Sequence, residues 1–217
     1  MGQRGALKYI RKRGLDMFIG EWNKSVILTY IGMAFAVLGI YFVQQDMIYR
    51  AFACLIVAGV CDLFDGAVAR KCKRNENQKL FGIQLDSLVD VMSFLALPIV
   101  ICIGIGMNKW YHMIFLIVFG ICGIARLAFF NVVSESSDGP VSYYRGLPVT
   151  YTALILSVVY LSSFALEEAI VIWIMTATVL IIAFMNIFDV KVKKPRGAAY
   201  PCFALLAVVM LVIYLCN

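Results

Sequence analysis

Long apolar runs alternate with short polar segments along most of the chain. Each run has roughly the 20 residues that a helix needs to cross the hydrocarbon layer of a bilayer, where backbone polar groups must be paired internally. We therefore predict seven transmembrane helices, near residues 25–43, 47–70, 82–106, 110–132, 147–166, 169–188 and 198–215. If the last run is re-entrant or lies flat on the membrane, the number falls to six. The short connections predict one membrane domain over residues 25–217, an all-α bundle of six to seven transmembrane helices.

The first 24 residues form a different kind of segment, in which apolar side chains such as Leu7 and Phe18 are mixed with basic ones such as Arg4 and Arg11. This mixture predicts an amphipathic juxtamembrane helix on the cytoplasmic side, lying on the surface of the inner leaflet. The alternative is a solvated tail whose charge only sets the topology of the helices that follow.

Composition supports the membrane assignment, since 63% of the 217 residues are hydrophobic and 15% are charged. Soluble domains contain about 45–50% apolar and 25% charged residues, so a mean hydropathy of +0.89 excludes a soluble globule. The net charge of +6 points to anionic membrane lipids as partners and not to nucleic acid. Almost all Lys and Arg residues lie in the N-terminal segment and in every second loop. The positive-inside rule therefore places the N-terminus and these loops in the cytoplasm.

Four aspartates stand where the second apolar run ends and the third begins. Asp62 and Asp65 are three residues apart and Asp86 and Asp90 are four apart, so each pair shares one face of its helix. Carboxylates in membrane helices are costly unless they are paired, solvated or bound to metal. Antiparallel neighbouring helices can bring the two pairs together, and oxygen ligands of this kind select hard cations such as Mg²⁺ or Mn²⁺.

The residues around these aspartates suit a phosphate-containing ligand. Gly66 and Gly82 leave room for close approach of a ligand, and Arg70 offers a guanidinium fork for phosphate. The alternative for the aspartates is ion pairing with Arg70, Arg126 and loop lysines that sets helix packing. The alternative for the two glycines is close contact between membrane helices.

Together these residues form the pattern D-x2-D-G-x2-A-R-x11-G-x3-D-x3-D, which resembles the signature of the CDP-alcohol phosphatidyltransferases. The resemblance implies a bundle of membrane helices that forms a homodimer, with two divalent metal ions (Mg²⁺ or Mn²⁺) as cofactors. It implies that Asp90 is the general base. It further implies that the metal ligands are Asp62, Asp65, Asp86 and Asp90. The CDP-lipid pocket would be lined by Gly66, Ala69, Arg70 and Gly82.

Two features extend or depart from that signature. The segment between Arg70 and Gly82 is longer than is usual in the family, and Lys79 stands where relatives often carry Thr or Ser. We include Lys79 among the candidate contacts of the CDP-lipid. The start of the first run resembles the family's entry into its first helix. Asn23 and Ser25 are therefore further candidates for this contact, with helix capping as the alternative.

Three more stretches are similar to the bacterial and archaeal branch of the family that uses L-serine: QLDSLVDVMSF (84–94), ARLAFFN (125–131) and RGLPVT (145–150). The resemblance implies CDP-diacylglycerol and L-serine as substrates, phosphatidylserine and CMP as products, and a prokaryotic plasma membrane as the location. The serine carboxylate requires a cation, for which Arg126 and Arg145 are the candidates. The alternatives are an ion pair with an aspartate or a lipid phosphate for Arg126, and interfacial anchoring for Arg145.

Other functions remain open at this point. The same chemistry could use glycerol 3-phosphate or inositol phosphate as the acceptor. A divalent-cation transporter could use the four aspartates but has no evident need for Gly66 or Arg70, and a non-catalytic membrane scaffold needs none of these residues.

Overall fold

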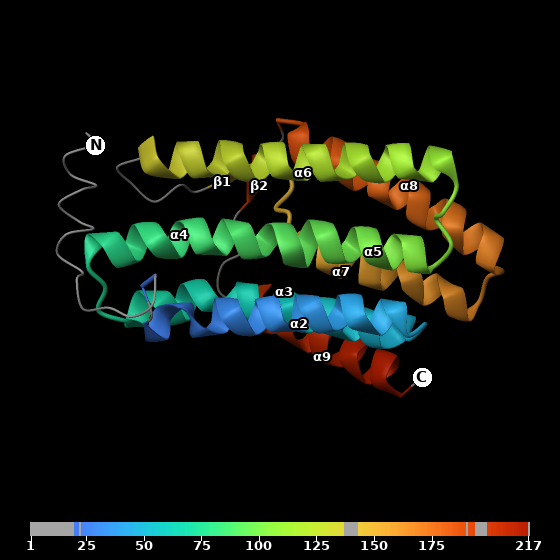
Figure 1. Ribbon diagram of the computed structural model, residues 1–217, viewed down its shortest axis with the longest axis horizontal. Coiled ribbons are helices and arrows are strands. Elements are labelled where there is room, and N and C mark those ends of the chain that lie inside the picture. The colour runs from blue at the N-terminus through green and yellow to red at the C-terminus, as the bar shows by residue number, and fades with distance from the viewer. Residues whose placement is uncertain (1–19, 22, 137–142, 190, 194–198, 217) are drawn as a thin grey trace.

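The computed structural model describes residues 20–21, 23–136, 143–189, 191–193 and 199–216. The N-terminal amphipathic helix was predicted over residues that lie mostly outside this described part. Within it the chain is almost entirely helical (Figure 1). An all-helical membrane bundle is therefore the correct fold class.

Helices occur at all seven of the predicted apolar runs. The first run forms a short 3₁₀ helix followed by an α-helix, and the third is one long helix with a π-helical turn inside it. The elements are η1 (Lys24–Val26), α2 (Ile27–Gln44), α3 (Ile48–Lys71), α4 (Glu76–Val91), η2 (Met92–Ala96), α5 (Leu97–Gly104), α6 (Trp110–Ser136), α7 (Tyr151–Tyr160), η3 (Leu161–Phe164), α8 (Glu168–Ile187) and α9 (Ala199–Leu215).

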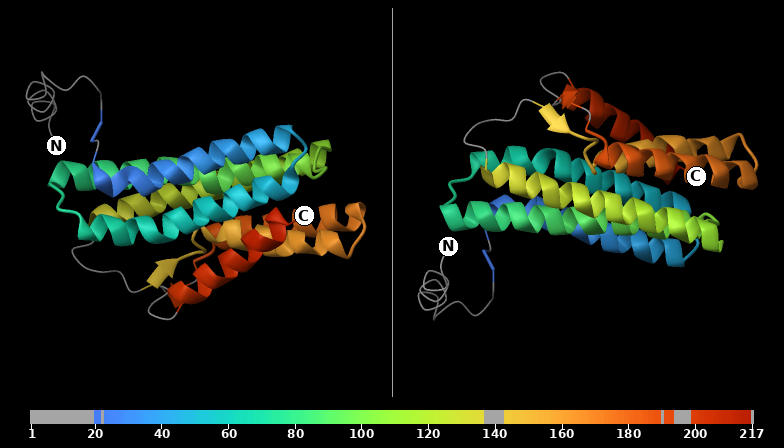
Figure 2. Two further views of the ribbon diagram at one scale, coloured as in Figure 1. Left: turned by 90° about the horizontal axis from the view of Figure 1, so that it is seen from below. Right: turned by 90° about the horizontal axis from the view of Figure 1, so that it is seen from above.

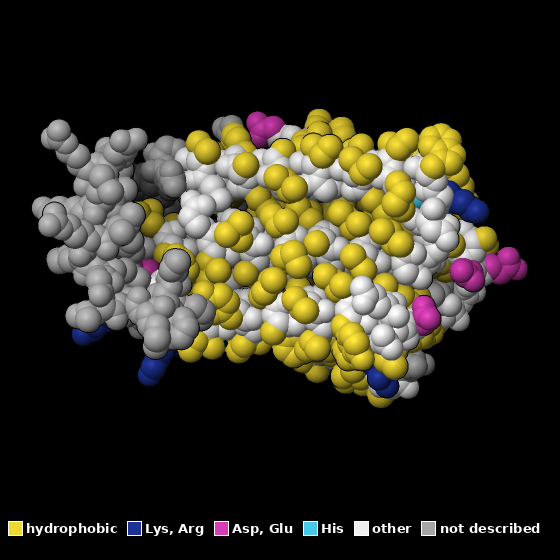
Figure 3. Space-filling model, viewed as in Figure 1, with side chains coloured by type: hydrophobic (Ala, Val, Ile, Leu, Met, Phe, Trp, Pro, Cys, Tyr) yellow, Lys and Arg dark blue, Asp and Glu magenta, His cyan; other side chains and the backbone are white. Residues whose placement is uncertain are grey.

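The outer surface of the bundle is suited to lipid. In the described residues, five helical segments are long and apolar enough to cross a membrane, and the segments 151–164 and 201–215 are shorter apolar helices. Hydrophobic side chains cover the long side of the molecule, whereas charged side chains gather at its two ends (Figure 3). Large residues that would be buried in a soluble protein are open here, such as Leu88 and Ile121, which are 67% and 62% exposed.

Helix α3 lies at the centre of the fold and packs against α2, α7 and α9. The helices α7, α8 and α9 lie together on one side of α2, α3, α4 and α6 (Figure 2). Phe52 of α3 is fully buried, and its ring stacks on Tyr160 and Tyr214 at centroid distances of 4.5 and 5.4 Å. The Tyr214 hydroxyl donates a hydrogen bond of 2.5 Å to the backbone carbonyl of Ser157. These contacts fix α9 against α3 and α7.

The third helix begins earlier than the prediction of residue 82. Asn75 and Gln78 form a capping box, in which each side chain accepts a hydrogen bond from the backbone N–H of the other residue. Such a box satisfies N–H groups that lack partners at a helix start, so α4 begins at Glu76. Hydropathy missed these turns because their side chains are polar. Gly82 and Asp86 therefore lie inside the helix and not at its first turn.

The π-helical turn η2 follows Asp90 directly and is surrounded by close contacts. Ser93, Phe94 and Leu95 are buried within it. Gly123 of α6 lies against Leu95, so closely that a Cβ at position 123 would come within 2.9 Å of the Leu95 Cδ1 atom. The absence of a side chain at Gly123 thus lets α6 approach the turn that follows the aspartates.

Two short strands, β1 (Tyr143–Arg145) and β2 (Lys191–Lys193), pair antiparallel near the ends of α7 and α8. Gly146 follows with φ of 74°, and a Cβ there would lie 2.7 Å from the carbonyl oxygen of Asn186. Both the positive φ and the close approach of this carbonyl favour glycine at position 146. The pairing, which the hydropathy pattern did not predict, holds the chain just before α7 in place.

Candidate active site

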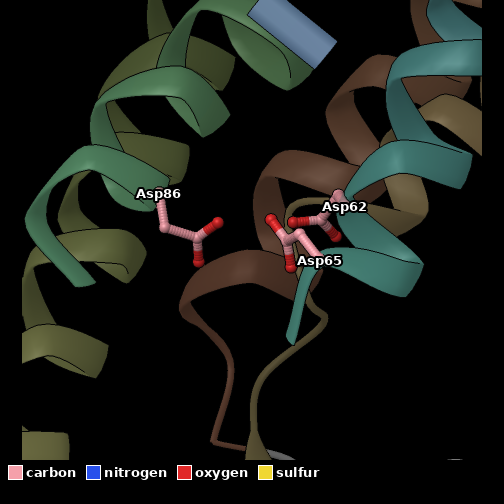
Figure 4. Close-up of side chains that lie close together, drawn as sticks. All are labelled: Asp62, Asp65 and Asp86. Carbon is pink, nitrogen blue, oxygen red and sulfur yellow. The ribbon is translucent and has the colours of Figure 1, made fainter. Parts of the chain in front are cut away.

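Asp62 and Asp65 of α3 face Asp86 of α4 across the space between the two helices (Figure 4). One carboxylate oxygen from each of the three lies within 4.8 Å of the others. The helical spacing of three residues places the first two on one face of α3, and the capped turn between α3 and α4 returns the chain so that Asp86 meets them. The juxtaposition of these three predicted ligands is therefore a property of the fold.

Asp90 lies one helical turn beyond Asp86 and next to Asp62. Its side chain lies next to that of Asp62, whereas the side chain of Asp86 lies next to that of Asp65. Asp90 is outside the group of three whose oxygens lie within 4.8 Å. The four predicted carboxylates are thus adjacent, with Asp90 displaced toward the interior of the bundle.

Two hydroxyl residues outside the predicted ligand set border the same cluster. The Thr29 hydroxyl of α2 donates a hydrogen bond of 3.3 Å to Oδ2 of Asp65. Ser93 lines a small cavity together with Thr29, Asp62 and Asp90, and its buried hydroxyl has no hydrogen-bond partner among the described residues. Nothing local in the sequence marks Thr29, because its contact with Asp65 joins residues 36 positions apart.

A larger cavity of about 310 Å³ opens from the carboxylates. Asp62, Asp65, Asp86, Gly66 and Arg70 line its polar part. A Cβ at position 66 would lie 3.5 Å from Nη1 of Arg70, so the guanidinium rests above the bare backbone of Gly66. A phosphate in this cavity would therefore lie close both to the Arg70 guanidinium and to the carboxylates.

The other candidate contacts of the CDP-lipid on α3 and α4 lie outside the lining of this cavity. A Cβ at position 82 would lie 3.6 Å from Nη1 of Arg74. Arg74 is therefore a second arginine next to a motif glycine, after Arg70 next to Gly66. Ala69 is half-buried on α3 and Lys79 is exposed on α4. Among the described residues, Ala69, Lys79 and Gly82 do not line the large cavity. Arg74 belongs to the segment between Arg70 and Gly82.

Asn23 and Ser25 lie at the start of η1. The Asn23 side chain accepts hydrogen bonds from the backbone N–H of Ser25, at 2.8 Å, and from its hydroxyl. These are the contacts of a helix cap, the alternative considered for these two residues. In the described part of the chain neither residue lines the cavities beside the aspartates.

The two candidate arginines for serine have different settings. Arg126 of α6 is 8% exposed, its guanidinium lies 4.8 Å from the centre of the Phe130 ring, and its charge acts on Asp62. Arg126 is therefore a buried cation close to Asp62. The backbone of Arg145 ends β1, three residues before Pro148, which lines the large cavity. Ser87 donates a hydrogen bond of 2.9 Å to Asn131, which joins α4 to α6 beside this region.

The family profile described as CDP-alcohol phosphatidyltransferase matches residues 22–184, which include both aspartate pairs. The chain belongs to the CDP-alcohol phosphatidyltransferase family. The profile match covers α2 to most of α8 and ends before α9.

Curated relatives narrow the comparison. The chain is 41% identical over 112 residues to the CDP-diacylglycerol--serine O-phosphatidyltransferase of Saccharomyces cerevisiae, a match that covers 48% of this chain and 40% of the yeast protein. It is 29% identical over 173 residues to the archaetidylserine synthase of Methanothermobacter thermautotrophicus, covering 78% of this chain and 68% of that protein. A CDP-diacylglycerol--serine O-phosphatidyltransferase of Methanocaldococcus jannaschii is 31% identical over 110 residues, about half of each chain. The chain thus spans less than half the length of the yeast relative.

The chemistry of the donor set fits a divalent metal. Three carboxylate oxygens within 4.8 Å of one another repel strongly unless a cation lies between them. They offer only oxygen ligands, which suits Mg²⁺ or Mn²⁺. Next to a cavity with an arginine, such a cluster can hold a metal ion against a phosphate group.

Proposed function

We propose that this protein transfers the phosphatidyl group of CDP-diacylglycerol to L-serine and so produces phosphatidylserine and CMP. The observation that carries the proposal is the meeting of Asp62 and Asp65 with Asp86 in the wall of a cavity that also contains Arg70. Two of the relatives described above are named for transfer to serine. Their names favour serine over glycerol 3-phosphate or inositol phosphate as the acceptor.

In this proposal Asp62, Asp65 and Asp86, with Asp90 beside them, would hold two divalent metal ions. When bound, such ions neutralise the negative charge of a diphosphate and of the transition state in phosphoryl transfer. Arg70 binds the phosphate of the CMP portion, because its guanidinium lies over Gly66 in the same cavity. The absence of a side chain at Gly66 leaves space for both groups.

Asp90 acts as the general base. It takes the proton from the serine hydroxyl, whose oxygen forms a bond to the phosphorus that carries the diacylglycerol. The bond between this phosphorus and the oxygen leading to CMP breaks, and CMP leaves with the electron pair. Asp90 suits this task because it contacts Asp62 but lies outside the three closest carboxylates.

Arg126 binds the carboxylate of serine. It is a buried cation on α6, and it is close enough to Asp62 for the two charges to interact. Arg145 is a second candidate because β1 leads directly to the cavity-lining residues at the start of α7. A cation is required here because an unpaired carboxylate is costly in a site with little water.

We also propose that the site faces the cytoplasm of a prokaryotic cell and that the protein is a homodimer. The described loop at the site end of the bundle carries Lys71, Lys73 and Arg74, as the positive-inside rule requires of a cytoplasmic loop. Labelling of single cysteines in sealed vesicles tests the orientation, and crosslinking in the membrane tests the dimer.

The decisive experiment supplies purified protein with CDP-diacylglycerol, Mg²⁺ or Mn²⁺, and an equimolar mixture of L-serine, glycerol 3-phosphate and inositol phosphate. Mass spectrometry of the lipid products is expected to detect phosphatidylserine. A phosphatidylglycerol phosphate or phosphatidylinositol phosphate product would instead identify another acceptor. Metal flux into proteoliposomes without nucleotide would support a transporter.

A further inference from the structure

The large cavity continues beyond the carboxylates into an apolar arm. At one end it is lined by Asp62, Asp65, Asp86 and Arg70, and along the rest by apolar side chains of three helices. These include Ile56 and Val60 of α3, Leu154 of α7, and Phe203, Ala207 and Met210 of α9. One continuous space therefore joins a strongly charged region to an apolar one.

The arm is long and follows the helices. Along α3 the lining runs from Asp65 back to Ile56, which at 1.5 Å per residue is roughly 14 Å. On α9 the lining residues are spaced by four and three positions, so they share one face of that helix over roughly 10 Å. Ala207 and Met210 are 7% and 1% exposed, whereas their neighbours Val208 and Val209 face outward, at 56% and 47%.

Helix α9 lies outside the part of the chain that matches the family profile, which ends at residue 184. It is nevertheless fixed firmly in place. Tyr214 near its end is 1% exposed and is held by the hydrogen bond to Ser157 and by the ring of Phe52. Phe203 near its start lies edge-on to Tyr151, with 5.9 Å between the ring centres. The apolar arm thus has a rigid wall that the family signature does not include.

We propose that this arm binds the first part of one acyl chain of the lipid donor, so that α9 helps to align the reacting phosphorus with the carboxylates. The inference rests on the proposed function. Of the reactants, L-serine, ribose, cytosine and phosphate are all polar, and only the acyl chains match an apolar wall. A chain that enters the arm starts at the carboxylate end, where the glycerol phosphate of the donor would lie.

The arm is expected to act by positioning and not by tightening binding. An acyl chain that leaves the bilayer for this arm exchanges one apolar environment for another, because lipid tails are as apolar as leucine side chains. Its gain is a fixed geometry at the reacting centre, and displacements of about 1 Å there can change rates by two orders of magnitude. Blocking the arm should therefore affect donors with long chains and spare donors whose chains are too short to reach it.

The test compares Ala207→Phe, which fills the arm, with Val208→Phe, which adds the same ring on the outward side of α9. Each purified variant is assayed with a long-chain donor, CDP-dioleoylglycerol, and with a short-chain donor, CDP-dibutyrylglycerol, in mixed micelles at saturating L-serine. We expect Ala207→Phe to lower kcat/KM for the long-chain donor roughly tenfold or more. For Ala207→Phe, kcat/KM with the short-chain donor should change less than about twofold, because that donor does not reach the arm. For Val208→Phe, kcat/KM with either donor should also change less than about twofold, because the added ring lies outside the arm.

The graded variants Ala207→Val and Ala207→Leu keep the test conclusive if the phenylalanine variant does not fold, since the ratio of long-chain to short-chain kcat/KM should fall with side-chain size. An equal loss with both donors, or an increase in the KM for serine alone, would overturn the acyl-chain assignment while leaving the proposed reaction intact. If the unmodified protein forms no phosphatidylserine from either donor, the proposed function itself fails, and the acyl-chain assignment fails with it.

Discussion

The Thr29 hydroxyl of α2 donates a hydrogen bond to Asp65 of α3, with 3.3 Å between Oγ1 and Oδ2. The first membrane helix therefore orients a carboxylate that belongs to the second. Thr29 is 8% exposed, so this hydroxyl has little access to water as an alternative partner. A group that holds a metal ligand in this way contributes to the affinity of the site without touching the metal.

We predict that Thr29→Val lowers both Mg²⁺ affinity and kcat by roughly 10-fold or more, because loss of an outer hydrogen bond typically costs 10–100-fold at metal sites. Thr29→Ser retains the hydroxyl and should stay close to the unmodified protein. Titration of thermal stability with Mg²⁺ measures the affinity, and a phosphatidylserine assay measures kcat. Equal behaviour of the Val and Ser variants would show that the hydroxyl does not act on Asp65.

Metal binding should stabilise the fold, because ions that bind only the native state raise its unfolding free energy by about 2.7 kcal/mol at a concentration 100 times Kd. We expect Mg²⁺ or Mn²⁺ to raise Tm by several degrees and a chelator to reverse this. Asp86→Asn should remove most of the shift. The control is Asp46→Asn, which changes an acidic residue in the α2–α3 turn, where φ of 58° also suits asparagine. A shift that persists in Asp86→Asn would place the metal elsewhere.

Asp90→Asn should abolish proton removal from the acceptor while leaving donor binding in place. General base catalysis contributes about 10²–10⁴-fold, so we expect kcat to fall by at least roughly 100-fold. The midpoint of stabilisation by CDP-diacylglycerol, followed by thermal unfolding, should change little. Substantial remaining turnover would refute the role of Asp90 as the base.

Arg126→Ala should raise the KM for serine more than the KM for the CDP-lipid. A hydrogen bond to a charged group contributes about 1.5–3 kcal/mol, which corresponds to an increase of roughly tenfold or more in the serine KM. Arg126→Lys should recover part of the loss, because a cation remains but the planar fork does not. Initial rates over a matrix of both substrates provide the two constants. A serine KM that is unchanged in Arg126→Ala would remove this residue from the acceptor site.

The packing of α6 on the π-helical turn can be tested with a matched pair of glycines. Gly123→Ala places a Cβ against the buried Leu95 side chain, with Cδ1 at 2.9 Å and Cγ at 3.2 Å. Gly120→Ala on the same helix meets Ile99 at an ordinary 3.6 Å. We expect Gly123→Ala to reduce stability by about 1–3 kcal/mol, as overpacked cores do, and Gly120→Ala to leave it nearly unchanged. Denaturant unfolding in detergent measures both, and equal stabilities would contradict tight packing at Gly123.

Hydropathy was sufficient to predict the helices, because each apolar run is long and contains few charged residues. It failed at the polar start of α4, where the capping box of Asn75 and Gln78 extends the helix by more than a turn. It also gave no indication of the pairing between β1 and β2, which depends on segments far apart in the sequence. Hydropathy detects apolar stretches along the chain. The start of α4 is polar, and the pairing of β1 with β2 joins distant segments, so neither feature leaves a hydropathy signal.

The aspartate spacing similarly predicted which faces of α3 and α4 carry carboxylates, and the structure brings Asp62, Asp65 and Asp86 together. It could not predict Thr29, because that contact joins residues 36 positions apart. Nor could it predict Arg74, whose place next to Gly82 depends on the path of the longer segment between α3 and α4. The roles of these residues in catalysis stay predictions until the variants are assayed.

The wide turn over Met92–Ala96 has a mechanical consequence for the helix that contains it. A π-helical turn holds one residue more than an α-helical turn, and each residue of an α-helix rotates the next side chain by about 100°. If the same residues formed a regular α-helix, the extra residue would therefore twist Asp86 and Asp90 by roughly that angle relative to Leu97 and Ile101, which are both fully buried. Either the acidic pair or the apolar pair would then be turned toward lipid. The wide turn thus absorbs one extra residue and keeps the reactive half of this helix in phase with its anchoring half.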